Sequence, residues 1–371
     1  MRAACGLAAH CLLPTAYCSL PTMKINDLEF YLVEIARTEL EEPVRSLLVR
    51  LATDTGAEGW GEAGLQWRAG ELSARRKALL PVLAGRSIFD IEDLLALEVL
   101  NSAPLRCAVE TACWDLIGRA TRQPLCNLFG GGYRWRIPLA VRLTGSRPDR
   151  VAEVARAMAE QGFHAQIVTS CGRPEQDLQA LAAVRAAAGE RIELRFDGRS
   201  NYDLEAASDL CAELEYDSPK FFLDPLNTRD LFTVATLGRQ TSVPLAVCRA
   251  IQSPADVLAA VRCGAAPFIV VGIEQVGGIT AARRCAAVAE AGGVSAVLAG
   301  GPSLGIATAA MLQLAAATPI FSGPSECAYH QLKDHLLSEP LEIVDGMMAV
   351  PQSSGLGVEV DRAKVERYQV T

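Results

Sequence analysis

The sequence predicts an α/β protein in which an N-terminal α+β capping domain precedes a C-terminal (β/α) barrel of TIM type. Three observations carry this prediction. The chain has 371 residues, which is long for a single core. Strand-like segments come before helical ones in its first third, an α+β pattern. From about residue 137, short apolar runs alternate with amphipathic helices, as in a parallel barrel.

The same pattern predicts where the domains begin and end. We expect an extension over residues 1–22, the capping domain over 23–135, the barrel over 136–345 and a tail over 346–371 that returns to the capping domain. Residues 1–22 are apolar and rich in cysteine, which has two interpretations. A signal-like segment is one, but Pro14 and Tyr17 interrupt the apolar run, so we favour a disordered extension before Met23.

Composition excludes several classes of function. The net charge is −8 and no basic face is evident, so we expect no nucleic-acid partner. No stretch approaches the roughly 20 apolar residues of a membrane span, so we expect a soluble protein without a membrane partner. The 12 cysteines form no CxxC pair and no cluster with histidine. This usage argues against a metal-thiolate site and fits the reducing cytoplasm.

The capping domain is predicted from three strands and the helices after them. Residues 23–36 alternate in polarity and 46–51 form a second strand. Asp54-Thr55-Gly56 is typical of a hairpin turn into the return strand Gly59-Trp60-Gly61-Glu62-Ala63. Apolar residues at helical spacing predict helices over 76–83, 91–100 and 108–118.

Eight short apolar runs predict the barrel strands: 137–141, 165–168, 192–196, 221–223, 244–247, 268–271, 294–298 and 319–321. Helices between them include 149–161, 174–188, 204–214 and 254–263. Active sites of such barrels lie at the carboxyl ends of the strands. The residues expected at these ends are Thr169, Ser170, Cys171, Asp197, Asp224, Cys248, Arg249, Gly272, Glu274, Gly300 and Glu326.

Several motifs appear in the order known from one family. They are Gly59-Trp60-Gly61-Glu62, the helix 108–115, the segment 121–131, Val276-Gly277-Gly278-Ile279-Thr280 and the tail 346–361 with Gly355-Leu356-Gly357. Over about residues 23–370 the chain resembles the enolase superfamily, in its muconate-lactonizing enzyme and mandelate racemase branch. The resemblance implies the capped barrel and a homo-oligomer, a dimer or an octamer.

The resemblance also implies a chemistry. Members of the branch hold Mg²⁺ with carboxylates at the ends of strands three, four and five, and the metal stabilises the enediolate formed when a base removes an α-proton. Asp197 and Asp224 match the first two ligand positions, and the third aligns with Cys248. A neutral thiol is a poor ligand for a hard cation, so Mg²⁺ is possible but doubtful here.

The bases that the resemblance implies are absent. They are a lysine on strand two, a lysine on strand six, or a histidine on strand seven. No lysine occurs between Lys77 and Lys220 or between Lys220 and Lys333, and no histidine lies between His164 and His330. Thr169 ends strand two in place of a lysine.

Other groups at the barrel mouth leave alternatives open. Arg249 could replace the metal by pairing with Asp197 and Asp224, or hold a substrate carboxylate, or be structural with both aspartates. Glu326 matches an acidic position on strand eight and is a candidate acid or base. Glu274 is expected to be a solvated loop residue.

Two cysteines, a histidine, a glycine-rich segment and a polar loop complete the survey of candidate residues. Cys171 and Cys248 could be nucleophiles, but neither has a histidine nearby in sequence, which favours inert thiols. His164 should lie at the bottom of the barrel. The segment 300–305 could bind an anion at a helix start, a weak signal. Arg45 ends the polar loop 37–45, which is expected to close over the barrel.

We therefore expect a divergent member of the branch that binds or converts a small carboxylate after losing most of the Mg²⁺-assisted machinery. The catalytic candidates are Arg249, Glu326 and Thr169, and the substrate-binding candidates are Arg249 and Arg45. One alternative is an active Mg²⁺-dependent racemase, epimerase, dehydratase or cycloisomerase acting on a carboxylic acid. A second is a non-catalytic structural or regulatory oligomer.

Overall fold

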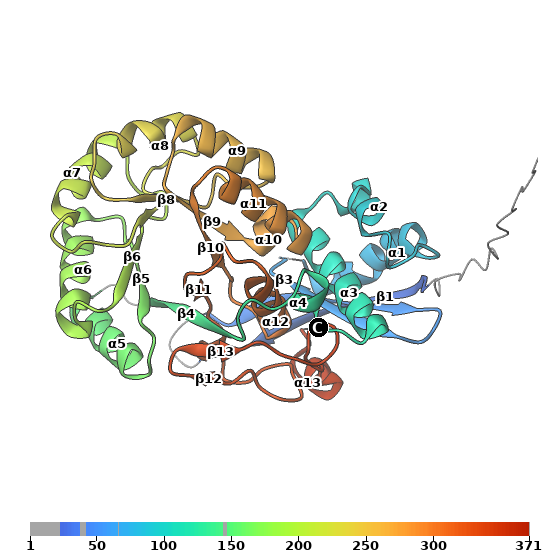
Figure 1. The fold of residues 1–371 in the computed structure, drawn as a ribbon. Coiled ribbons are helices and arrows are strands. Elements are labelled where there is room, and N and C mark those ends of the chain that lie inside the picture. Colours follow the sequence, from blue (N-terminus) through green and yellow to red (C-terminus); the bar gives the residue numbers. More distant parts are fainter. Residues whose placement is uncertain (1–22, 38–41, 66, 144–146, 371) are drawn as a thin grey trace, which may run out of the picture.

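The computed structural model describes residues 23–370, except 38–41, 66 and 144–146. An antiparallel sheet with its helices forms one domain, and a barrel ringed by helices forms the other (Figure 1). The predicted extension over residues 1–22 and part of the predicted loop 37–45 lie outside the described residues. The described part of the chain has no helix with the length and apolar character needed to cross a membrane.

The capping domain is built on a sheet in the order β1-β2-β3. These strands are β1 (Ile25–Ile35), β2 (Val44–Thr53) and β3 (Glu58–Ala63). The helices that follow are η1 (Ala69–Glu71), α1 (Leu72–Leu83), α2 (Ile91–Leu95), η2 (Glu98–Leu100), α3 (Ala103–Thr121) and α4 (Leu125–Leu128). The three predicted strands and the turn at Gly56, which has a φ of +79°, are confirmed.

Two glycines of β3 allow this strand to lie directly on α3. A Cβ atom on Gly61 would lie 1.8 Å from the carbonyl oxygen of Ala108, and one on Gly59 would lie 2.3 Å from that of Ala112. Both contacts are with helix backbone, which cannot swing aside as a side chain can. The Gly59-Trp60-Gly61 motif is therefore a packing requirement of the capping domain.

The barrel is a closed parallel sheet in which each strand pairs with the next and β11 pairs with β4. Its strands are β4 (Arg136–Leu143), β5 (Ala165–Thr169), β6 (Glu193–Asp197), β7 (Phe222–Leu223), β8 (Leu245–Val247), β9 (Phe268–Gly272), β10 (Ser295–Ala299) and β11 (Ser325–Glu326). The helices are α5 (Pro148–Glu160), α6 (Pro174–Ala188), α7 (Leu204–Leu214), α8 (Leu231–Gly238), α9 (Pro254–Cys263), α10 (Ile273–Val276), α11 (Ile279–Ala291) and α12 (Ile306–Ala317), with η3 (Tyr329–Gln331) after β11. Helices α5 to α9 form an arc outside the strands (Figure 1).

Capping explains why the barrel helices begin and end where the sequence predicts. The Ser253 side chain accepts a hydrogen bond from the backbone N–H of Asp256 at the start of α9, and Gly264 ends that helix with a φ of +63°. The Asp203 side chain accepts from the N–H of Ala206 at the start of α7. Such caps satisfy the N–H groups that the first turn leaves without partners.

The eighth strand is a correction. The apolar run 319–321 predicts it, but the strand is β11, and Phe321 is a fully buried turn residue whose N–H donates to Thr318. Apolar character predicts burial, and the side chain of Phe321 is buried at the end of a turn without forming part of a strand. The shift brings Glu326 to the barrel mouth as the last residue of the strand.

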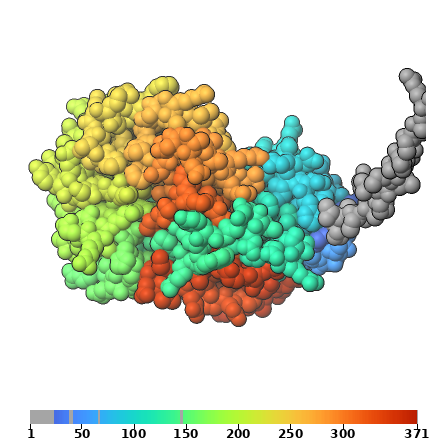
Figure 2. Space-filling view, in the orientation of Figure 1, coloured from blue at the N-terminus to red at the C-terminus, as the bar shows by residue number. Residues whose placement is uncertain are grey.

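The C-terminal segment returns to the capping domain. A hairpin of β12 (Ile343–Val344) and β13 (Met347–Ala349) pairs with the start of β4 before α13 (Arg362–Tyr368). The tail then passes the start of α4, where the N–H of Leu125 donates to the carbonyl oxygen of Gly355. Figure 2 shows these red C-terminal residues beside the teal residues around α3.

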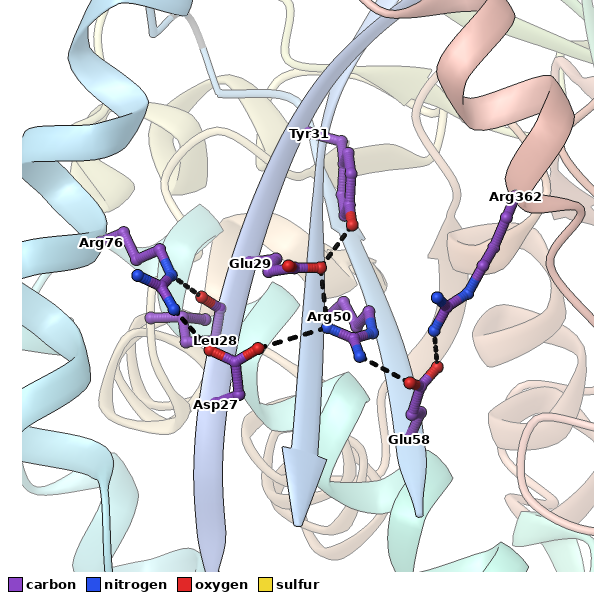
Figure 3. Close-up of polar contacts among 8 residues, drawn as sticks. All are labelled: Asp27, Leu28, Glu29, Tyr31, Arg50, Glu58, Arg76 and Arg362. Carbon is purple, nitrogen blue, oxygen red and sulfur yellow. Dashed lines mark hydrogen bonds and ion pairs between the residues drawn. The ribbon is translucent and has the colours of Figure 1, made fainter. Parts of the chain in front are cut away.

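An ion-pair network on the capping sheet fastens this tail (Figure 3). Arg50 of β2 lies between Glu29 at 2.7 Å and Glu58 at 2.5 Å, and Arg362 of α13 pairs with Glu58 from the other side. The two guanidinium groups lower the pKa of Glu58 to about 2, against the effect of its partial burial. Glu58 thus connects the C-terminal tail to the capping sheet through ion pairs with Arg362 and Arg50.

One apolar core runs through both domains. Val33, Leu48 and Trp60 of the capping strands pack in the same cluster as the barrel residues Phe196 and Leu298. The capping sheet and α3 share a second cluster on the other side. The capping domain is therefore packed onto the barrel and fixes one wall of the space between them.

Candidate functional site

The barrel mouth holds a charged cluster centred on Arg142, near the end of β4. Its Nη1 atom lies 2.6 Å from Asp197 Oδ2 and 2.9 Å from Thr169 Oγ1. Its Nε and Nη2 atoms each lie 2.9 Å from Glu326 Oε1. The cluster joins the ends of strands β4, β5, β6 and β11, and the two carboxylates raise the pKa of the Arg142 guanidinium.

The structure therefore brings together three residues that were predicted to lie at strand ends, Thr169, Asp197 and Glu326. The arginine that joins them, Arg142, was not predicted from the sequence. Arg142 lies near the end of strand one, whereas the predicted site residues lie at the ends of later strands. The signal was present, because Arg142 follows an apolar run and alternates with buried neighbours in β4. A charged residue at that place is expected to face the barrel mouth.

Asp224 lies directly after β7 and is held by backbone donors. Its Oδ1 atom accepts from the N–H of Cys248 at 2.9 Å, and its Oδ2 atom accepts from the N–H of Arg249 at 3.1 Å. Asp224 has a φ of +41°, which aspartate tolerates better than most residues. Burial raises its pKa to about 6, although the two N–H donors act in the opposite direction.

Arg249 corrects a second expectation. Its Nε atom lies 3.9 Å from Asp224, at the outer limit of an ion pair, and within the described part of the chain it forms no ion pair with Asp197. The side chain is 42 % exposed. Among the described residues Arg142, and not Arg249, is the cation that pairs with Asp197. The roles of Arg249 in catalysis or substrate binding remain predictions.

The Mg²⁺ site implied by the resemblance does not fit these residues. Asp197 is paired with Arg142 through Oδ2 and accepts from the N–H of Arg199 through Oδ1. Cys248 offers a thiol whose pKa is raised well above its usual value by burial and by Asp224. Within the described residues, no group of three or more His, Cys, Asp or Glu side chains is arranged to hold a metal ion. Mg²⁺ prefers octahedral oxygen ligands, which a thiol and a carboxylate already paired with arginine do not supply.

Beside this cluster lies a cavity of about 850 Å³ between the two domains. Its walls come from the ends of β1 and β2 in the capping domain and from the loops after β8, β9 and β10 in the barrel. Its charged and polar lining residues include Glu34, Arg37, Glu42, Arg45, Glu62, Thr111, Glu274, Gln275, Ser303 and Thr308. Such a volume is typical of a site for a small organic molecule.

Arg45 is the predicted binding residue that the structure brings to this cavity. Its side chain is half-buried at the start of β2, and its Nε atom is buried without a hydrogen-bond partner among the described residues. A buried N–H donor without an acceptor costs about 1–3 kcal/mol. An anion in the cavity would relieve this cost.

Glu274 also corrects its prediction as a solvated loop residue. It lies in the short helix α10 and lines the cavity, and its Oε2 atom accepts from the N–H of Gly64 at 2.9 Å. Burial raises the pKa of Glu274, with the Gly64 N–H opposing the shift. It therefore binds a proton at a higher pH than an ordinary glutamate does.

Glu62, at the back of the cavity, joins the domains. This fully buried carboxylate of β3 accepts from the N–H groups of Leu304 at 2.5 Å and Ala307 at 3.0 Å, at the start of α12. The helix dipole favours a negative charge there. The segment 300–305 was predicted as a possible anion site. Its Leu304 N–H is instead occupied by the Glu62 carboxylate of the chain itself.

The remaining candidates do not form a nucleophilic site in the described structure. Cys248 lines the cavity with its thiol 3.9 Å from the Gln275 amide oxygen, and Cys171 is exposed, with a pKa raised mainly by burial. Ser170 is buried in hydrogen bonds with Asp177 and Tyr202. His164 directly precedes β5, at the opposite end of the strand from Thr169.

Family models match both domains. The model described as the mandelate racemase / muconate lactonizing enzyme N-terminal domain matches residues 29–130, and the enolase C-terminal domain-like model matches residues 149–364. The chain belongs to the enolase superfamily, in its mandelate racemase and muconate lactonizing enzyme branch. The resemblance inferred from the motifs is thereby confirmed, together with the capped-barrel fold.

Similar proteins carry related names. Muconate cycloisomerase 1 of Rhodococcus opacus is 27% identical, with 87% of this chain and 90% of that protein covered. A chloromuconate cycloisomerase of Cupriavidus pinatubonensis is 30% identical, with 78% and 80% covered. The crystal structure of a muconate cycloisomerase from Azorhizobium caulinodans has a TM-score of 0.83 at 28% identity, covering 93% of this chain and 98% of that one.

Proposed function

We propose that this protein is a divergent member of its branch that binds a small carboxylate in the cavity between its domains, without Mg²⁺-assisted α-proton abstraction. The observation that carries the proposal is the Arg45 Nε donor, buried at a cavity of about 850 Å³ and without an acceptor among the described residues. A ligand carboxylate supplies the missing acceptor and a charge of opposite sign.

Two features of the lining support an anionic ligand. Arg37 lies on the same side of the cavity as Arg45, so two guanidinium groups border it. Glu274 would repel an anion when ionised, but burial raises its pKa and so extends the pH range in which the carboxyl is neutral and can donate a hydrogen bond to a ligand. Carboxylate binding should therefore weaken as the pH rises through the pKa of Glu274.

The similar cycloisomerases support the ligand class. They are named for muconate and chloromuconate, which are dicarboxylates. Conversion by their route would need a metal and a base. The pairing of Asp197 with Arg142 and the absence of lysine and histidine from the expected base positions argue against that route here.

Isothermal titration calorimetry with a chelator present tests the proposal. Muconate and other small mono- and dicarboxylates are titrated into the wild-type protein and Arg45→Gln. We expect at least one carboxylate to bind the wild type and to lose about tenfold or more in affinity in the variant, because a charge-assisted hydrogen bond contributes about 1.5–3 kcal/mol.

Two controls sharpen this comparison. Arg150→Gln removes an exposed arginine of α5 that pairs with Glu153, and it should bind as the wild type does. Glu274→Gln should flatten the pH dependence, because an amide does not titrate in this range. Absence of binding by every carboxylate, or binding that appears only when Mg²⁺ is added, contradicts the proposal.

A further inference from the structure

The Arg142 cluster offers an inference that does not depend on carboxylate binding. Three carboxylates, Asp197, Asp224 and Glu326, lie around the barrel mouth at the ends of β6, β7 and β11. Such a group of buried negative charges needs a counter-charge, because ionised side chains are costly to remove from water. The cluster contains that counter-charge within the chain.

We propose that Arg142 is a built-in cation that takes the place of a divalent metal ion at the barrel mouth. Its Nη1 atom lies 2.6 Å from Asp197, and its Nη2 atom lies 2.9 Å from Glu326. The guanidinium is thus held between carboxylates from β6 and β11. It is a fixed positive charge that no chelator can remove.

Most N–H donors of the Arg142 guanidinium group already have acceptors within the chain. Nε and Nη2 are directed at Glu326, and Nη1 serves both Asp197 and Thr169. Little donor capacity is left for an external anion, so Arg142 is not a substrate anchor. Its planar fork matches carboxylates from several directions, which is the property that suits arginine to buried ion pairs.

The position of Arg142 also predicts what its removal would do to the barrel. It bridges the closure of the barrel, where β11 pairs with β4 through only two residue pairs, Ser325 with Leu139 and Glu326 with Ala140. Removing the guanidinium would leave Asp197 and Glu326 facing each other without a cation. Two carboxylates in that situation attract a hard divalent ion that accepts oxygen ligands.

Mn²⁺ binding to Arg142→Met tests the inference. Methionine keeps much of the length of the side chain and removes its charge. Free Mn²⁺ is measured by its electron paramagnetic resonance signal, and thermal unfolding is recorded with Mn²⁺ and with a chelator. We expect the wild type to leave Mn²⁺ free, with no change in melting temperature. The variant should melt lower in chelator, bind Mn²⁺ and recover part of the loss.

Three companion variants identify the cause. Combining Arg142→Met with Asp197→Asn should abolish the gained Mn²⁺ binding. Arg136→Met removes an exposed arginine from the other end of β4 and should leave Mn²⁺ free, as the wild type does. Arg142→Lys retains a positive charge and should also exclude Mn²⁺.

The wild-type measurement can overturn the inference alone. If the wild type binds Mn²⁺ with a rise in melting temperature that Asp197→Asn abolishes, the guanidinium yields to a metal and the proposal is wrong. A folded Arg142→Met that gains no Mn²⁺ binding also contradicts it. If Arg142→Met does not fold, wild type and Arg142→Lys decide the matter, since Mn²⁺ binding by the lysine variant would overturn the inference.

Discussion

The carboxyl group of Asp224 lies against two backbone N–H groups of the loop after β8, and burial raises its pKa to about 6. Both hydrogen bonds stabilise the ionised form, yet they do not offset the loss of water around the charge. The group therefore binds a proton more tightly in the folded chain than in the unfolded chain, where its pKa is close to 3.8.

This difference predicts how Asp224 affects stability. Because the folded state holds more protons between about pH 4 and pH 6, the contribution of Asp224 to the free energy of unfolding falls as the pH rises through that window. About two pKa units correspond to roughly 3 kcal/mol. Asp224→Asn should lack this decline, because an amide does not ionise and its oxygen still accepts an N–H.

Urea unfolding of the wild type and Asp224→Asn at a series of pH values measures the effect. The stability of the variant relative to the wild type should rise between about pH 4 and pH 6 and then level off. Asp90→Asn, at an exposed position of the capping domain, should show no such trend. A difference between Asp224→Asn and wild type that stays constant with pH would refute the prediction.

At the scale of single residues, the sequence predicted which groups occupy the strand ends but not how they pair. The sequence predicts Asp197, Glu326 and Thr169 at the barrel mouth, and it offers Arg249 as one possible cation for Asp197 and Asp224. An arginine side chain is long and flexible, so its partner is decided by the three-dimensional approach of strands. Residue 142 lies far from residue 326 in sequence, and only barrel closure brings them together.

At the scale of elements, the contact between β3 and α3 shows how sequence constrains packing. The backbone of Gly61 approaches the carbonyl of Ala108 so closely that no Cβ atom fits, since it would lie 1.8 Å away. Neither β3, which is paired with β2, nor the 19-residue helix α3 can shift independently of its neighbours. The interface therefore tolerates glycine alone.

Gly61→Ala should destabilise the protein by roughly 3 kcal/mol, because overpacking a closely packed interface costs about 1–3 kcal/mol and occasionally more. Gly70→Ala is the matched control, since no heavy atom lies within 4 Å of a Cβ at that position. Urea unfolding followed by tryptophan fluorescence reports on both variants, with Trp60 adjacent to the first. Equal stabilities for the two variants would contradict the account.

The elements themselves were predicted well where a periodic pattern and its caps agree. Helices α6, α7 and α9 begin and end at the predicted residues. The eighth strand was misplaced, because 319–321 is apolar but forms a turn in which Phe321 is buried and Pro319 is exposed, whereas β11 consists of Ser325 and Glu326. A two-residue strand has no periodicity, and its pairing with β4 and β10 defines it.

At the scale of the whole molecule, the capping domain and the barrel act as one packed unit. The shared core, the docking of Glu62 on the start of α12 and the tail bound near Glu58 fix the distance between the two domains. This fixed distance produces the cavity, whose walls come from segments more than 200 residues apart. No local sequence pattern specifies such a space, although the family resemblance implied that a site would lie there.

The charges of the molecule divide into two regions with different roles. At the barrel mouth, Arg142 pairs with the carboxylates and completes its own contacts. In the cavity, Arg45 keeps a donor without an acceptor among the described residues. This division underlies our account of a carboxylate-binding protein that has moved away from metal-assisted chemistry.

Exchange of the α-proton is the most direct test of that account. A carboxylate that binds is incubated with the protein in D₂O and excess Mg²⁺, and its α-proton signal is followed by ¹H nuclear magnetic resonance. The account predicts that the signal is lost no faster than in the absence of protein. Rapid exchange that requires the protein, and that a chelator or Asp197→Asn abolishes, would show a working metal site and contradict it.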